Sequence, residues 1–172
     1  SDQATTNLLG VGDVVYSGVF LPAGDSVESD GVPLANLAGS GEEVISASKI
    51  LRGDSQLLLQ RNATETQFKA LRLADFRVIH LAVHGVGNTK FPDRAALVLG
   101  GSPASDEDGL LQAREIRELS LNADLVILSA CDTGNGRLLG QEGIASLERA
   151  FLLAGAKDVI ASLWTADGTY SI

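Results

Sequence analysis

Three continuous apolar runs do most to limit the folds open to this chain. They cover residues 77–83, 124–129 and 158–164 and are rich in valine, isoleucine and leucine. A strand that is apolar at successive positions is buried on both faces, as in a parallel sheet covered by helices. Helical patterns separate the runs, so the sequence predicts an α/β sandwich with a mostly parallel central sheet and helices on both faces.

Sequence patterns also predict the elements that connect these strands. Ser40 with Glu43 three residues later has capping-box spacing and begins a predicted helix that ends at Gly53. Thr64 caps a second predicted helix. Two further helices are expected over 112–119 and 142–154, with short strands over 57–59 and 95–99.

The first forty residues give weaker signals than the rest of the chain. Residues 10–41 are rich in Gly, Ser, Asp and Pro and hold one short strand candidate, residues 13–20. We therefore expect a loop-rich N-terminal segment over residues 1–38, belonging to the same domain as a core over residues 39–172. The core is expected to be truncated at its C-terminus, because residues 171–172 follow a strand-like run without a closing element.

Charge and cysteine content exclude several classes of function. The net charge of −9 disfavours nucleic-acid binding and docking on anionic membranes, both of which need clustered Lys and Arg. The sequence shows neither a transmembrane run nor a secretory signal. Cys131 is the single cysteine, which fits a reducing, cytoplasmic setting.

A histidine and the cysteine follow two of the apolar runs. His84 lies just past the first run and is followed by Gly85, and Cys131 lies just past the second. Thiol catalysis needs a base for the thiol proton and donors for the developing oxyanion. If the two strands are neighbours, the imidazole, the thiol and the backbone N–H groups of Gly85 and Cys131 converge at one edge of the sheet. Cys131 lies 47 positions after His84, close to the separation of roughly 50 seen in caspases.

Several blocks of sequence, in order, resemble the CHAT branch of caspase-like cysteine peptidases. The resemblance covers about residues 39–164, most of the chain. The blocks are 80–85 (HLAVHG), 108–116 (DGLLQAREI), 128–134 (LSACDTG), 140–143 (GQEG), 149–156 (RAFLLAGA) and 159–164 (VIASLW).

The resemblance implies a caspase-like fold and a cysteine endopeptidase that cleaves a protein or peptide substrate. Cys131 would be the nucleophile and His84 the acid and base, while the backbone N–H groups of Gly85 and Cys131 would form the oxyanion hole. From their place directly after Cys131, Asp132 and Thr133 are candidate substrate-binding residues, and two roles stay open for Asp132: attraction of a basic substrate residue, or hydrogen bonds to nearby loop amides. No metal or cofactor is expected. The family further implies a tetratricopeptide-repeat region outside this chain and a role in bacterial signalling or defence.

Three alternatives stay open from the sequence. The chain could be a catalytically inactive interaction domain that kept the fold, or another Cys-His acyl hydrolase such as an amidase. Cys131 could be a buried structural cysteine. His80, four residues before His84, is expected to be a core or sheet-face residue rather than half of a metal pair, because its run has the composition of a strand.

Overall fold

Strands and helices alternate along the chain in the computed structural model, which describes residues 4–16, 20–21, 32–88, 90–102, 104–132 and 140–165. The strands are β1 (Thr6–Val14), β2 (Phe20–Leu21), β3 (Val32–Pro33), β4 (Ser55–Gln60), β5 (Phe76–Val86), β6 (Ala96–Val98), β7 (Leu110–Gln112), β8 (Leu125–Asp132) and β9 (Asp158–Thr165). The helices are α1 (Ser40–Leu51), α2 (Glu65–Ala70), α3 (Ala113–Ile116) and α4 (Gly140–Ala154), with short 3-10 helices η1 (Leu73–Asp75) and η2 (Pro92–Arg94).

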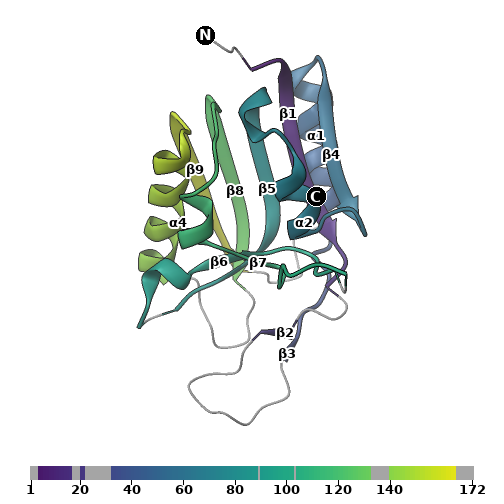
Figure 1. Ribbon diagram of the computed structural model, residues 1–172. Coiled ribbons are helices and arrows are strands. Elements are labelled where there is room, and N and C mark those ends of the chain that lie inside the picture. Colours follow the sequence, from purple (N-terminus) through teal and green to yellow (C-terminus); the bar gives the residue numbers. More distant parts are fainter. Residues whose placement is uncertain are drawn as a thin grey trace.

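A seven-stranded, mostly parallel sheet forms the centre of the molecule (Figure 1). Strands β4, β1, β5, β8 and β9 lie side by side in that order, and each neighbouring pair is parallel. β6 pairs antiparallel with the end of β5, and β7 pairs with β6. The chain moves outward from β1 to β4 on one side and from β5 to β8 and β9 on the other. The strand order therefore reverses between β1 and β5, where sites in such sheets form beyond the carboxyl ends of the strands.

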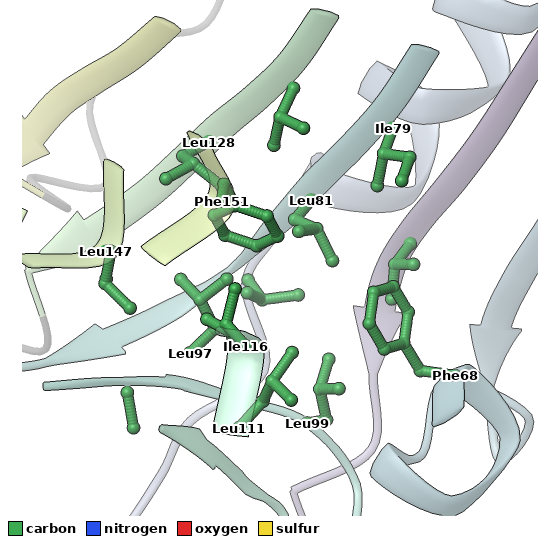
Figure 2. Packing of buried hydrophobic residues seen from close by; sticks show 14 of the residues in the cluster. Phe68, Ile79, Leu81, Leu97, Leu99, Leu111, Ile116, Leu128, Leu147 and Phe151 are labelled. Carbon is green, nitrogen blue, oxygen red and sulfur yellow. The ribbon is translucent and has the colours of Figure 1, made fainter. Parts of the chain in front are cut away.

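One face of the sheet carries most of the apolar core. Buried side chains from α2, α3 and α4 meet buried side chains of β5 and β8 there (Figure 2). The labelled members include Phe68, Ile116, Leu147, Phe151, Ile79, Leu81 and Leu128. Full burial of a side chain of this size contributes about 1.5–3 kcal/mol. This face therefore supplies a large part of the stability of the fold.

Helix α1 covers the opposite face of the sheet, over β1 and β5. Glycines in β1 allow the helix to approach closely. A Cβ at Gly12 would lie 2.6 Å from the backbone oxygen of Ser40, and a Cβ at Gly10 would lie 3.0 Å from the Cβ of Val44. Helices thus lie on both faces of a mostly parallel sheet, which confirms the predicted fold class. None of the helices in the described part of the chain has the length and apolar character to cross a bilayer.

Two local predictions in the N-terminal part are wrong. The strand expected over residues 13–20 is placed too late: β1 covers Thr6–Val14, residues 15–16 are not in a strand, and residues 17–19 lie outside the described residues. The capping box expected for Ser40 and Glu43 is not formed, because Gly39 is the N-cap of α1, with φ of 82° and no side-chain cap. Ser40 and Glu43 make tertiary hydrogen bonds instead. The division between residues 1–38 and 39–172 stays a prediction.

Candidate active site

The carboxyl ends of β5 and β8 bring the two predicted catalytic positions together. The parallel register sets His84 opposite Cys131 and Gly85 opposite Asp132. Both strands run further than predicted, so His84 and Cys131 lie within the last residues of their strands rather than beyond them. The structure describes Cys131 and Asp132 by their backbone, and Thr133 lies outside the described residues.

The imidazole of His84 is buried and held from two sides. Its Nε2 lies 2.7 Å from the backbone oxygen of Ala35, in the segment that precedes α1. The ring of Tyr16 lies 4.8 Å from the imidazole, centroid to centroid. The Tyr16 hydroxyl also accepts a hydrogen bond of 3.1 Å from the backbone N–H of His84. These contacts join the end of β5 to the segments that follow β1 and precede α1.

These contacts assign the proton on the His84 ring. A backbone carbonyl only accepts hydrogen bonds, so Nε2 carries a proton and donates it to Ala35. Nδ1 is buried and has no hydrogen-bond partner among the described residues. Burial lowers the pKa of His84, and the hydrogen bond to Ala35 offsets this only in part. The neutral ring is therefore favoured, with an Nδ1 lone pair available to take a proton.

A second histidine on β5 lies in a different hydrogen-bond network. The Nε2 of His80 lies 2.8 Å from Glu43 Oε1 on α1 and 3.3 Å from Ser129 Oγ on β8. Ser129 Oγ donates a hydrogen bond to the same Glu43 oxygen. The hydrogen bond from His80 is the largest cause that lowers the pKa of Glu43. His80 is buried in the sheet as the sequence predicted, but the sequence did not indicate these polar partners.

This second network lacks the arrangement of a serine-hydrolase triad. A triad needs the hydroxyl and the carboxylate on opposite nitrogens of the imidazole. Here Ser129 and Glu43 both lie at Nε2 of His80, and the Ser129 proton is directed to Glu43. The Nδ1 of His80 has no hydrogen-bond partner in the part of the chain described. The network therefore connects α1, β5 and β8 without activating the hydroxyl.

Three carboxylates near α2 have the spacing of a metal site, but a lysine ammonium lies among them. Oxygens of Glu65, Glu107 and Glu115 lie within 4.8 Å of one another. Lys69 Nζ lies 2.8, 2.7 and 3.0 Å from them, in that order. Glu65 is fully buried, and its other oxygen accepts a 2.9 Å hydrogen bond from the N–H of Gly109. The ammonium supplies the positive charge that a cation would bring, so the cluster anchors the loop before β7.

Four residues around the two histidines were not predicted from the sequence. Tyr16 and Ala35 reach His84 from distant parts of the chain, and Ala35 does so through a backbone oxygen that any residue could offer. Glu43 was assigned to a helix cap. Ser129 alone carried a signal, as a polar residue inside an apolar run.

Comparison with known proteins identifies the family. The family model of the CHAT domain matches residues 3–169. Tetratricopeptide repeat protein 28 of Mus musculus is 44% identical over 55 residues, and the protein of the same name from Homo sapiens is 40% identical over 55 residues. Each match covers 32% of this chain and 2% of the length of the relative, so the chain spans a very small part of these proteins. The match over nearly all of the chain shows that it belongs to the CHAT domain family, which is caspase-like.

Proposed function

We propose that the chain is a cysteine endopeptidase that cleaves a protein or peptide substrate with Cys131 as nucleophile and His84 as acid and base. The parallel register of β5 and β8 carries the proposal, because it sets these two residues opposite one another. The orientation of His84 supports it further. Its protonated Nε2 is bound to Ala35, while the buried Nδ1 has no partner among the described residues.

The first half of the reaction forms an acyl-enzyme. Nδ1 of His84 takes the thiol proton, and the Cys131 sulfur attacks the scissile carbonyl carbon and forms a C–S bond. The carbonyl oxygen becomes an oxyanion, which the backbone N–H groups of Gly85 and Cys131 would stabilise. The intermediate collapses, the C–N bond breaks, and the proton on His84 passes to the leaving amine.

The second half of the reaction releases the product. His84 takes a proton from water, and the resulting hydroxide attacks the thioester carbon. The C–S bond breaks, and the proton returns to the sulfur of Cys131. The ring gains and loses one proton in each half, which suits an imidazole whose neutral form is favoured by burial. None of these steps calls for a metal or an organic cofactor.

The substrate and partners follow from charge and family. The net charge of −9 favours basic or neutral peptide segments over acidic ones, and Asp132 and Thr133 would contribute to their binding. The relatives are named as tetratricopeptide repeat proteins, so we propose that a repeat region outside this chain regulates the site. A catalytic thiol without a second cysteine suits the cytoplasm. The role in bacterial signalling or defence is proposed from the family resemblance alone.

Alkylation of the single thiol tests the proposal directly. An iodoacetamide probe is applied across pH to the native chain, to His84→Ala, and to each protein unfolded in denaturant, where Cys131 has an ordinary pKa. A thiol paired with an imidazole should react well below pH 8 in the native chain, and His84→Ala should abolish this difference from the unfolded thiol. Equal behaviour of the two folded proteins would instead support a non-catalytic interaction domain.

A peptide-cleavage assay then separates thiol activation from peptidase activity. The native chain and Cys131→Ser are incubated with a library of unstructured peptides, and new peptide termini are identified by mass spectrometry. Cleavage that depends on Cys131 is expected. An activated thiol that cleaves no peptide but hydrolyses small amides would favour the amidase alternative.

A further inference from the structure

We propose that Glu43 is a positioning residue for the His84–Cys131 pair. It acts through hydrogen bonds that hold the start of α1, and the segment carrying Ala35, against the ends of β5 and β8. This inference rests on the proposed peptidase function and names a residue outside the reacting pair. It explains why a partly exposed helix carries a carboxylate directed at a buried histidine.

One carboxylate oxygen of Glu43 connects α1, β5 and β8. Oε1 of Glu43 binds His80 on β5 and Ser129 on β8. His80 lies four residues before His84, and Ser129 lies two residues before Cys131. Side chains of a strand alternate between its faces, so these even spacings place His80 on the face of His84. Glu43 therefore fixes α1 to both strands just upstream of both catalytic positions.

Hydrogen bonds of Ser40 connect α1 to the segment whose carbonyl orients His84. Ser40, in the first turn of α1, is buried, and its Oγ donates a 2.9 Å hydrogen bond to the oxygen of Leu37. The same Oγ accepts a 2.9 Å hydrogen bond from the backbone N–H of Asp13 at the end of β1. Ala35 lies two residues before Leu37. A shift of α1 would therefore move the Ala35 oxygen, which sets the tautomer of His84.

Two substitutions of Glu43 distinguish the role of its hydrogen bonds from the role of its negative charge. Both hydrogen bonds reach the same oxygen of Glu43, and a glutamine offers an equivalent oxygen at that position. Glu43→Gln removes the charge and keeps the oxygen that accepts the two hydrogen bonds. Glu43→Ala removes the charge and both hydrogen bonds. A positioning role predicts that glutamine rescues most of the effect. Glu42 is an exposed carboxylate in the same turn, so Glu42→Ala is a matched control.

The experiment reads the orientation of His84 and the reactivity of Cys131 separately. The chain has two histidines and one cysteine, so ¹⁵N imidazole spectra and alkylation rates are both simple to assign. In the native chain and in Glu42→Ala, His84 should be protonated at Nε2. Glu43→Ala should give a mixture of tautomers at His84 and slow the alkylation of Cys131 at neutral pH about tenfold, whereas Glu43→Gln should stay within about threefold of the native rate.

One outcome would overturn the inference without touching the proposed function. An unchanged His84 tautomer and an unchanged rate in Glu43→Ala would leave the network as a structural contact only. If Glu43→Ala does not fold, Ser129→Ala decides, since it removes one of the two bonds and should shift the tautomer and the rate in the same direction. The proposed function itself fails if His84→Ala does not alter the alkylation rate. In that case the His84 tautomer in the Glu43 variants alone shows whether Glu43 positions His84.

Discussion

The two faces of the central sheet differ in chemistry although they share the same strands. On β5, Ile79 and Leu81 face the apolar core beneath α2, α3 and α4, and the buried Val83 belongs to the same cluster. The alternating residues His80 and His84 face the other way and bind polar partners. A strand carries both sets because successive side chains point to opposite faces. One strand thus serves stability on one side and the candidate active site on the other.

This separation means that stability and function can be altered independently. The apolar face is filled by interlocking side chains whose contribution depends on area and fit. The α1 face is held by close backbone packing at Gly10 and Gly12 and by a few directional hydrogen bonds. A substitution on the apolar face should lower the free energy of unfolding and leave the site as it is. A substitution on the α1 face should disturb the site out of proportion to its effect on stability.

The largest effect is expected from Phe151→Ala on the apolar face. Phe151 is fully buried against the sheet, so its loss should cost about 3–5 kcal/mol of unfolding free energy. Denaturant unfolding measures this cost, with Leu152→Ala on the exposed side of the same helix as control. The milder Phe151→Leu keeps enough stability to test the site. Its folded fraction should alkylate at Cys131 like the native chain, and a slower rate would contradict the independence of the two faces.

A smaller loss of stability with a larger loss of reactivity is expected from Gly12→Ala. The added Cβ would lie 2.6 Å from the backbone oxygen of Ser40, so the start of α1 must move. Overpacking of this kind costs about 1–3 kcal/mol. Because Ser40 is bonded to the segment that carries Ala35, the orientation of His84 should be lost as well.

The matched control for Gly12→Ala is Gly39→Ala, also next to α1. A Cβ at Gly39 meets no atom within 4 Å, although its φ of 82° makes the substitution unfavourable. Gly39→Ala should lower stability by about 1 kcal/mol through backbone strain. We expect its folded fraction to keep the native alkylation rate. If both variants slow alkylation equally, the close approach at Gly12 is not what positions the site.

The same contrast between faces explains which features the sequence predicted. The apolar runs of β5, β8 and β9 are long and rich in β-branched residues, so they were predicted within a few residues. β1 was misplaced because Gly10, Gly12 and Asp13 weaken its strand pattern. Those glycines are required by the close approach of α1, which is a tertiary feature. Local propensity does not encode such a contact.

For the candidate site, the sequence predicted the two catalytic positions but not the partners of His84. His84 and Cys131 lie at the ends of recognisable strands, and strand adjacency is enough to bring them together. The partners of His84 lie 49 and 68 residues away in sequence and include a backbone oxygen, which carries no residue signature. Glu43 matched a local capping pattern, but its side chain forms tertiary hydrogen bonds with His80 and Ser129 instead of capping α1.

The smallest expected effect is on the pH dependence of stability, to which Glu43 on α1 and Glu65 on α2 should contribute with opposite signs. Hydrogen bonding to His80 lowers the pKa of Glu43 below 4.5, whereas burial raises the pKa of Glu65 from 4.5 to about 6. A lowered pKa contributes stability that is present above pH 4.5 and is lost as pH falls through the folded value. A raised pKa contributes stability that is fully present below pH 4.5 and is lost as pH rises through about 6.

Urea unfolding of the native chain, Glu43→Gln and Glu65→Gln between pH 3 and pH 7 tests these opposite signs. The stability of the native chain relative to Glu65→Gln should fall between pH 4.5 and about 6. Its stability relative to Glu43→Gln should rise as pH increases toward 4.5 and then stay level. Glu42→Gln should show neither trend. Equal signs for the two carboxylates would mean that Glu43 is not held as a charged acceptor, so its network would not be built as proposed.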